Sequence, residues 1–165
     1  PTKTSSLNTP VQSTFTFTRD NIMKKLTLAI LLLLPMIAEG AHTQNEVVAI
    51  TILAEARGEG ETGMYAVACV IAQRALERKK TPKAICLQKW QFSCWNANDP
   101  QRNRLGRLLK TPQAAYALRL AKHITEIDRS FTGNANHYHT KSVKPYWSKG
   151  KKPVKVLGNH LFFRL

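Results

Sequence analysis

The stretch VVAITILAEARGEGE, residues 47–61, decides the interpretation of the whole chain. It begins as an almost unbroken apolar run and ends in three carboxylates, one guanidinium and two glycines. The apolar part is long enough for about three helical turns. A helix that is apolar on nearly every side belongs inside a core. We therefore expect a buried helix that carries Glu55 near its C-terminal end.

The position of Glu55 suits an acid catalyst. A carboxyl group that is partly removed from water has a raised pKa, because burial disfavours its charged form. Such a group can hold a proton near neutral pH and give it to a leaving oxygen. The alternative is a helix end with solvated glutamates, and spacing alone favours that alternative. Motifs further along the chain are needed to separate the two interpretations.

The chain is strongly basic. Its 165 residues, enough for one domain with a modest core, include 25 Lys and Arg against 10 Asp and Glu. This balance predicts an anionic partner, such as nucleic acid, lipid head groups or an acidic wall glycan.

The N-terminal part is typical of a secretory leader. Residues 1–22 are polar and lack periodicity, whereas Met23 is followed by two lysines, an apolar run over 26–37 and small residues before Ala41. The run is shorter than the roughly 20 residues that span a bilayer; a buried helix or a retained anchor is the alternative. We expect three parts: an upstream disordered segment ahead of the true start (1–22), a signal peptide (23–40) and an exported domain (41–165).

Export changes the expected partner. Residues 41–165 keep 21 basic and 8 acidic residues, but an exported protein does not meet cytosolic nucleic acid. We therefore expect a monomer in the periplasm or cell envelope, with peptidoglycan strands and the anionic envelope surface as partners and no nucleic acid.

The remaining pattern predicts an α+β domain that is mainly helical, with a small antiparallel sheet near the C-terminus. Helix starts are indicated at Thr62, at Thr81-Pro82 and at Thr111-Pro112 by capping residues. A polar loop is expected over 96–107, and strands over 135–139 and 154–163.

Three motifs together resemble the cell wall hydrolases of the spore cortex-lytic (SleB) type. They are EARGE at 55–59 with Gly63 after it, QFSCW at 91–95, and a C-terminal block of NHYH at 136–139, Trp147 and GNHLFF at 158–163. They follow in the order of that family and extend over nearly all of the exported part. One departure is Ala54, where many relatives have Gly, which we expect to affect local packing more than chemistry.

The resemblance implies a lysozyme-like fold and a muramidase that cleaves peptidoglycan between N-acetylmuramic acid and N-acetylglucosamine. It implies a lytic transglycosylase in which Glu55 is the catalytic acid. Aromatic rings alternating with amides and hydroxyls also suit sugars, although core packing explains such patches equally well. We expect these residues to contact substrate: Glu59, Gln91, Phe92, Ser93, Trp95, His137, Tyr138, His139 and Trp147.

The carboxylates favour a mechanism with one acid. Glycoside hydrolysis usually needs two carboxylates on opposite sides of the bond. Only Glu55, Glu59 and Glu61 share a segment, and residues four apart lie on one helix face, so Glu55 and Glu59 cannot flank a sugar. We expect Glu59 to pair with Arg57 or to bond the turn. The other carboxylates are Glu46, Glu77, Asp99, Glu126 and Asp128.

Histidines and cysteines leave alternatives. His137, His139 and His160 could supply three imidazoles to a metal, but no zincin-type pair accompanies them, so we expect no metal and no cofactor.

In an oxidising compartment Cys86 and Cys94 could form a disulfide while Cys69 stays in the core; the competing view is three reduced, buried thiols. A non-catalytic basic envelope-binding protein is the alternative function, and a nucleic-acid-binding protein is a third.

Overall fold

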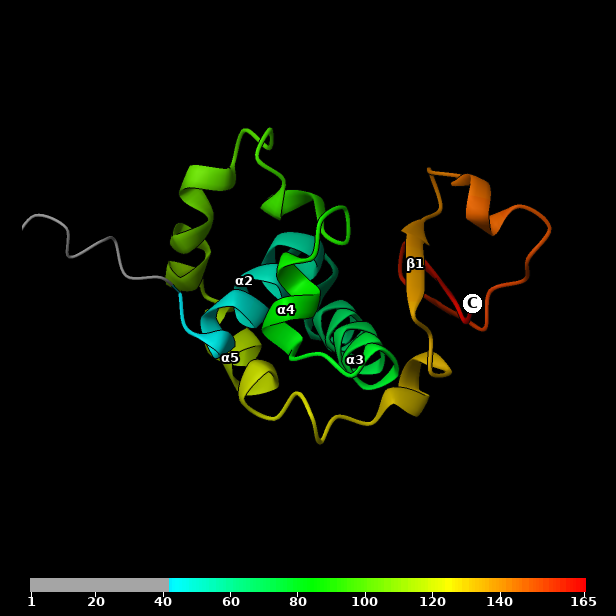
Figure 1. Cartoon of the computed structure of the whole chain (residues 1–165), viewed down its shortest axis with the longest axis horizontal. Helices are drawn as coiled ribbons and strands as arrows, with labels where there is room; N and C mark the ends of the chain where they lie inside the picture. The colour runs from blue at the N-terminus through cyan, green and yellow to red at the C-terminus, as the bar shows by residue number, and fades with distance from the viewer. Residues whose placement is uncertain (1–41) are drawn as a thin grey trace, which may run out of the picture. The chain divides into compact units, whose positions relative to one another are not determined.

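The structure, a computed structural model, describes residues 42–165, so the predicted upstream segment and signal peptide lie outside the described residues. Helices come first in this part and a small antiparallel sheet last, which confirms the predicted α+β class (Figure 1). No helix within 42–165 is long and apolar enough to cross a membrane.

The α-helices are α2 (Gln44–Ala56), α3 (Gly60–Arg78), α4 (Pro82–Leu87) and α5 (Ala114–Lys122). The 3₁₀ helices are η2 (Arg57–Glu59), η3 (Ser93–Trp95), η4 (Arg102–Lys110), η5 (Arg129–Thr132) and η6 (Tyr146–Ser148), and the strands are β1 (His137–Thr140), β2 (Lys155–Leu157) and β3 (His160–Phe163).

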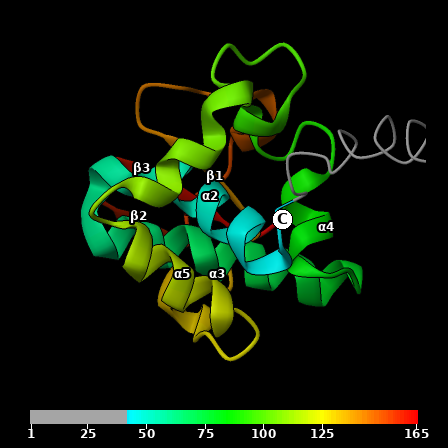
Figure 2. The same ribbon diagram turned by 90° about the vertical axis from the view of Figure 1, so that its left-hand side faces the viewer.

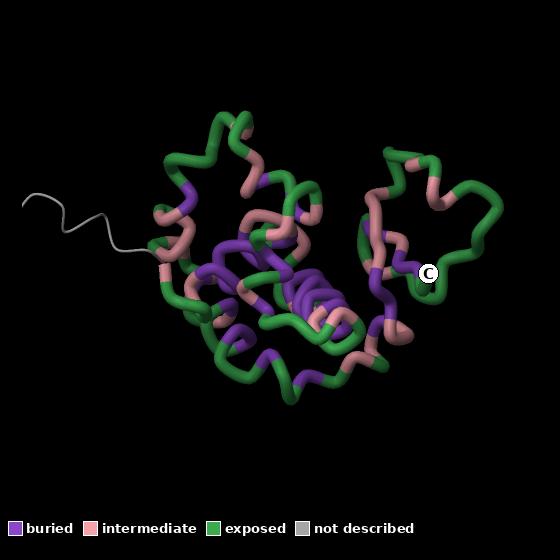
Figure 3. The backbone as a smooth tube through the Cα atoms, viewed as in Figure 1, coloured by how far each residue is buried: buried purple, intermediate pink, exposed green. Residues whose placement is uncertain are grey.

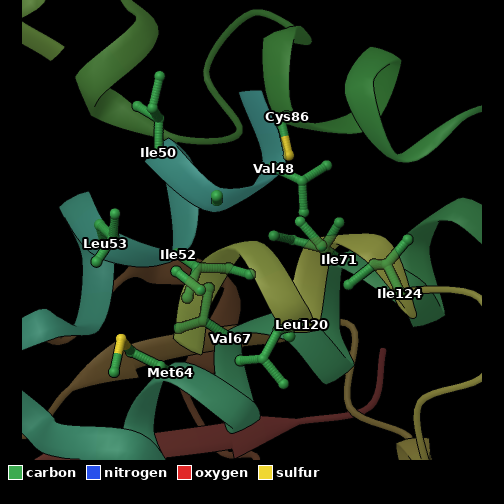
Figure 4. Packing of buried hydrophobic residues seen from close by; sticks show 14 of the residues in the cluster. Val48, Ile50, Ile52, Leu53, Met64, Val67, Ile71, Cys86, Leu120 and Ile124 are labelled. Carbon is green, nitrogen blue, oxygen red and sulfur yellow. The ribbon is translucent and has the colours of Figure 1, made fainter. Parts of the chain in front are cut away.

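Helix α2 is the central element, as residues 47–61 predict. Every residue from Val47 to Leu53 is buried, and α2 packs against α3, α4, α5 and η4. Figure 4 shows side chains of α2 meeting those of α3 and α5 in this core. Its N-terminus is closed by a capping box in which the Thr43 hydroxyl accepts from the Glu46 amide and the Glu46 carboxylate accepts from the Thr43 amide.

The other helix starts agree with the sequence only in part. Thr81 caps α4 by accepting from the Ala84 amide, with Pro82 in the first turn. Helix α3 begins at Gly60 without a side-chain cap, so Thr62 does not start it. The Thr111 hydroxyl donates to the Leu108 carbonyl instead of capping α5. The predicted polar loop over 96–107 becomes η4 in its second half, because the buried Leu105 fixes it on the core.

The sheet has the strand order β1-β3-β2 and two different faces. Tyr138 pairs with Phe162, and His139 pairs with Leu161, so alternation places neighbouring residues on opposite sides. We define the inner face by Tyr138, His160 and Phe162; Phe162 packs with Ala66 and Val70 of α3. We define the outer face by three other side chains of these strands: His137, His139 and Phe163.

All three cysteines are free and buried, so the structure has the reduced alternative rather than a Cys86–Cys94 disulfide. All three belong to the same hydrophobic core as α2. Cys86 is fully buried in the core, and the Cys69 thiol donates to the Asp128 carbonyl. Burial raises the pKa of each thiol to about 12, which suppresses the reactive thiolate.

Candidate active site

Glu55 lies in the last turn of α2, where the buried helix meets a cavity of about 270 Å³. Its side chain is partly buried. The apolar residues before it fix the helix in the core, so the carboxyl group is held at the cavity wall by a rigid element. The lining residues are Ala54, Glu55, Arg57, Ser93, Cys94, Asp99, Gln101, Arg104, Leu105 and Leu108.

Tyr138 makes the direct contact with the Glu55 carboxyl group. Its hydroxyl donates a hydrogen bond of 2.8 Å to Glu55 Oε2. Burial raises the pKa of Tyr138 well above its ordinary value, and the neighbouring Glu55 raises it further. The phenol therefore stays protonated and remains a donor at every pH at which the protein would work. Strand β1 thus brings a hydrogen-bond donor to a carboxyl group 83 residues away in sequence.

The pKa of Glu55 is raised from its ordinary value of 4.5, because burial disfavours the carboxylate. The hydrogen bond from Tyr138 and the positive charge of Arg74 act in the opposite direction, since both favour the carboxylate. The effect of burial is the largest of the three. Glu55 is therefore a carboxyl group that holds its proton to higher pH than an ordinary glutamate, yet has two neighbours that stabilise its anion.

Arg74 is a buried cation that the sequence analysis missed. It lies in α3 with 6% of its surface exposed. Its Nε donates to the Asn136 carbonyl at 2.6 Å, and its guanidinium lies 5.3 Å from the centre of the Phe92 ring. Its Nη1 has no hydrogen-bond partner among residues 42–165. A signal was present: Arg74 continues the inward-facing helical positions of Val67 and Ile71, where an apolar residue is expected.

Asp99 is a second residue of the candidate site that the sequence alone does not single out. It lines the same cavity as Glu55 but comes from the segment ahead of η4. Its Oδ1 accepts from the Gln101 amide at 2.8 Å, which fixes the turn that carries it. The cavity is therefore lined by two acidic residues from separate elements, together with Arg57 and Arg104. Glu55 and Asp99 are far apart in the sequence, so no local pattern predicts that they line the same cavity.

The aromatic segment contributes one of its four predicted residues to the cavity wall, Ser93. The Gln91 amide oxygen accepts from Arg78 Nη1 at 2.8 Å. Phe92 is 2% exposed in the core. The Trp95 indole donates to the Thr51 hydroxyl at 2.8 Å. These three side chains fasten the segment to α2 and α3, so that Ser93 and Cys94 face the cavity.

Glu59 connects two turns rather than lining the cavity. Its Oε2 accepts from the Asn159 amide at 3.2 Å, in the turn between β2 and β3. The expected pair with Arg57 is not formed; Arg57 Nη1 donates to the Leu53 carbonyl at 3.3 Å instead. Glu59 does bond a turn, but that turn is 100 residues away in sequence.

The C-terminal motif is divided between the two faces of the sheet. Tyr138 is directed toward Glu55, whereas His137 and His139 belong to the outer face with Trp147, whose ring centre lies 5.1 and 5.4 Å from theirs. His160 is on the inner face, so the three imidazoles do not converge. Within residues 42–165 no three His, Cys, Asp or Glu side chains are placed to hold a metal ion.

A family model described as Cell Wall Hydrolase matches residues 58–163, which is well over half of the 165-residue chain. The chain belongs to the Cell Wall Hydrolase family. Membership indicates an enzyme that acts on the cell wall, with peptidoglycan as its substrate. The matched range includes Glu59, Asp99 and Tyr138 but begins three residues after Glu55. No curated protein and no solved structure matches the chain significantly.

Proposed function

We propose that this cell wall hydrolase is a muramidase of the SleB type that cleaves the glycan strand between N-acetylmuramic acid and N-acetylglucosamine. It acts as a lytic transglycosylase with Glu55 as its single acid–base residue. One observation carries this proposal: a carboxyl group with a raised pKa lies at a cavity wall and accepts a hydrogen bond from Tyr138. An acid catalyst needs this combination of a retained proton and a stabilised anion.

In the proposed reaction Glu55 donates its proton to the glycosidic oxygen while the bond from that oxygen to the anomeric carbon breaks. The carboxylate that remains accepts the hydrogen bond of Tyr138 and is favoured by the charge of Arg74. The 6-hydroxyl of the muramyl residue then attacks the anomeric carbon, and Glu55 takes the hydroxyl proton. A 1,6-anhydro sugar forms, no water is consumed, and Glu55 regains its starting state.

Hydrolysis is the second candidate, and the position of Asp99 favours it. Inverting and retaining glycosidases use a second carboxylate as base or nucleophile, and Asp99 lines the Glu55 cavity from a different element. In this reaction Glu55 is still the acid. Asp99 either activates a water molecule or attacks the anomeric carbon, and the product carries an ordinary reducing end.

Mass spectrometry of the soluble fragments released from purified peptidoglycan tests both candidates, because anhydro and reducing ends differ by one water. We expect anhydro ends from the native protein. Glu55→Gln keeps the shape of the side chain but cannot donate the proton, so fragment release should fall by about 10²–10⁴. Full activity in this variant would remove Glu55 as the acid, and a non-catalytic envelope-binding protein would release no fragments in either form.

Asp99→Asn is the matched control. A transglycosylase should keep its anhydro products and most of its rate in this variant, whereas a hydrolase should lose activity as severely as in Glu55→Gln. Reducing ends from the native protein together with loss of activity in Asp99→Asn would replace the transglycosylase by the paired mechanism.

We also propose that the protein is exported to the periplasm or cell envelope as a monomer after cleavage before Ala41. Peptidoglycan lies outside the cytoplasm, so a wall-cleaving enzyme has to be exported to reach it. N-terminal sequencing of the protein recovered from the envelope should begin at Ala41; a protein that retains residues 23–40 would show an uncleaved leader.

A further inference from the structure

Residues 141–155, the connection that follows β1 together with the first residue of β2, concentrate positive charge. We call this segment the lysine loop. It contains six lysines and no Asp or Glu, and all six lysines are exposed. In Figure 1 it extends from the sheet on the side away from α3, and Figure 3 shows most of it as exposed. The six are Lys141, Lys144, Lys149, Lys151, Lys152 and Lys155.

The charge of the lysine loop is not neutralised by the described residues. The ion pairs found in residues 42–165 both involve a histidine, His42 with Glu46 and His123 with Glu126. No lysine of the loop therefore lies within ion-pair distance of a carboxylate in that part of the chain. Clustered charges of one sign raise the local concentration of counter-ions and attract anionic surfaces.

Apolar side chains are exposed among these lysines. Tyr146 is 86% exposed and Val143 is 52% exposed. The Lys149 ammonium group lies 5.3 Å from the centre of the Tyr146 ring. Tyrosine and lysine together are typical of a lipid–water interface, where the ring sits at head-group level and the lysine extends its charge to the phosphates. In water alone, the exposed side chains of Tyr146 and Val143 bury no apolar surface and so add nothing to stability.

The lysine loop is held in shape by Trp147. The Trp147 ring packs on the outer face, with ring centres 5.1 Å from His137 and 5.5 Å from Phe163. A turn next to it is closed by the Ser148 amide, which donates to the Pro145 carbonyl at 3.0 Å. Binding therefore need not order the whole segment, and its entropic cost is reduced.

The lysine loop is also separated from the candidate active site. Glu55 is contacted by Tyr138 on the inner face, whereas Trp147 anchors the loop on the outer face. A surface bound at the loop would therefore lie on the opposite face of β1 from the one that contacts Glu55.

We propose that the lysine loop docks the protein on the surface of an anionic phospholipid membrane. The lysines bind head-group phosphates, and Tyr146 and Val143 enter the boundary between head groups and acyl chains. An anionic wall glycan would satisfy the charges equally well but offers no apolar phase for Val143, so the observations favour lipid. This inference goes beyond the proposed function and does not depend on it.

Vesicle sedimentation tests the proposal. Residues 42–165 form one compact unit with its own core, so a protein that starts at Ala41 avoids any contribution of the apolar run at 26–37. We expect it to bind vesicles of phosphatidylglycerol and phosphatidylcholine, to ignore pure phosphatidylcholine, and to be released by salt. Each basic residue near an anionic membrane is worth about five-fold in binding. The triple variant Lys144→Gln, Lys149→Gln, Lys151→Gln should therefore bind roughly 100-fold more weakly.

The matched control removes the same charge elsewhere, through Lys80→Gln, Lys110→Gln and Lys122→Gln, three exposed lysines of the helical part. It should bind within about three-fold of the native protein, since these lysines lie outside the loop. Tyr146→Ser should weaken binding several-fold with every charge retained. Glu55→Gln should bind vesicles normally, and the triple loop variant should release fragments from purified peptidoglycan at the native rate.

Three results would overturn the proposal. Equal loss in the control and the loop variant would mean that only net charge matters. Equal binding to neutral vesicles would remove the role of the lysines. Loop-dependent binding to purified peptidoglycan without binding to anionic vesicles would make the loop a wall-binding surface instead.

Discussion

The two faces of strand β1 show how one short segment serves two purposes. On the inner face, Tyr138 donates to the Glu55 carboxylate at 2.8 Å. On the outer face, His139 stacks on Phe163 at 5.0 Å and meets the edge of Trp147. The residue types are similar, yet only the inner face contacts a carboxyl group. The content of aromatic residues and histidines therefore does not distinguish a surface that contacts the candidate acid from one that packs against other rings; the face of the strand on which each side chain lies does.

The two faces differ in which charged forms burial disfavours. Burial lowers the pKa of a histidine on each face, His160 on the inner and His137 on the outer. Only on the inner side does burial also raise the pKa values of a carboxyl group and the phenol that contacts it, Glu55 and Tyr138. The outer face packs ring against ring, with Trp147 between His137 and Phe163. We expect changes on the inner side to affect activity, and changes on the outer face to affect stability.

Among changes that compare the two faces, the largest effect is expected for Tyr138→Phe. The change keeps the ring and its packing on His160 and Phe162 but removes the donor to Glu55. A hydrogen bond to a charged group is worth about 1.5–3 kcal/mol, so the rate of fragment release should fall by roughly 10–100-fold. Rates on purified peptidoglycan, with circular dichroism to verify folding, measure this.

Trp147→Phe is the outer-face control. It should keep the rate within about three-fold and lower the free energy of unfolding by roughly 1–3 kcal/mol, because a smaller ring leaves space against His137 and Phe163. If Trp147→Phe reduced the rate as much as Tyr138→Phe while staying folded, the faces would not divide activity from packing.

A second prediction concerns how the sheet is tied to the helices. Gly158 has a φ of +52°, and a Cβ there would collide with the Glu59 carboxylate. Gly158→Ala should displace Glu59 from the Asn159 amide as well as strain the backbone. We expect a loss of about 2–3 kcal/mol of stability, which combines the left-handed conformation and one hydrogen bond.

Gly150→Ala separates these contributions. Gly150 has a φ of +71° and nothing within 4 Å of an added Cβ, so only the backbone cost of about 1–2 kcal/mol applies. Urea unfolding of both variants gives the difference. Equal losses would mean that the bond from Asn159 to Glu59 contributes nothing to holding the sheet against the helices.

Much of the fold could be predicted from local sequence. The apolar run of α2, the cap at Thr81 and the alternation of the C-terminal strands are short-range signals, and the structure contains all three elements. The cap predicted at Thr111 is wrong because its hydroxyl donates to the Leu108 carbonyl instead. The cap predicted at Thr62 is wrong because α3 already begins at Gly60, which places Thr62 inside the helix.

Less of the candidate site than of the fold could be predicted from the sequence. Glu55 and Tyr138 were predicted as site residues, and the structure brings them together. Asp99 was passed over because its neighbourhood depends on how the segment ahead of η4 folds over the end of α2, which no local pattern encodes. Arg74 interrupts an apolar stripe, and such an arginine is usually a surface residue whose stem is buried. Alternation predicts that Tyr138 opposes its two histidine neighbours, but not which face meets α2.

The smallest expected effect measures what the buried carboxyl group costs the fold. The folded-state pKa of Glu55 is raised above 4.5 by burial, so its contribution to stability is fully present below that value and is lost as pH rises through the raised pKa. Gln resembles the protonated acid and does not ionise. Glu55→Gln should match the native protein in stability near pH 4 and exceed it at pH 8, by no more than a few degrees in Tm.

Glu46, at the other end of α2, provides a control of opposite sign. Hydrogen bonds from Thr43 lower the pKa of Glu46, so its contribution is present above its unfolded pKa and is lost as pH falls. Glu46→Gln should be less stable than the native protein at pH 8, and the difference should disappear in acid. Thermal unfolding of the three proteins from pH 4 to pH 8 should give two difference curves, one rising above zero and one falling below it. A Glu55→Gln curve that stayed flat would mean that Tyr138 and Arg74 fully offset the burial of Glu55, and the carboxyl group would then lack the retained proton that the proposed acid requires.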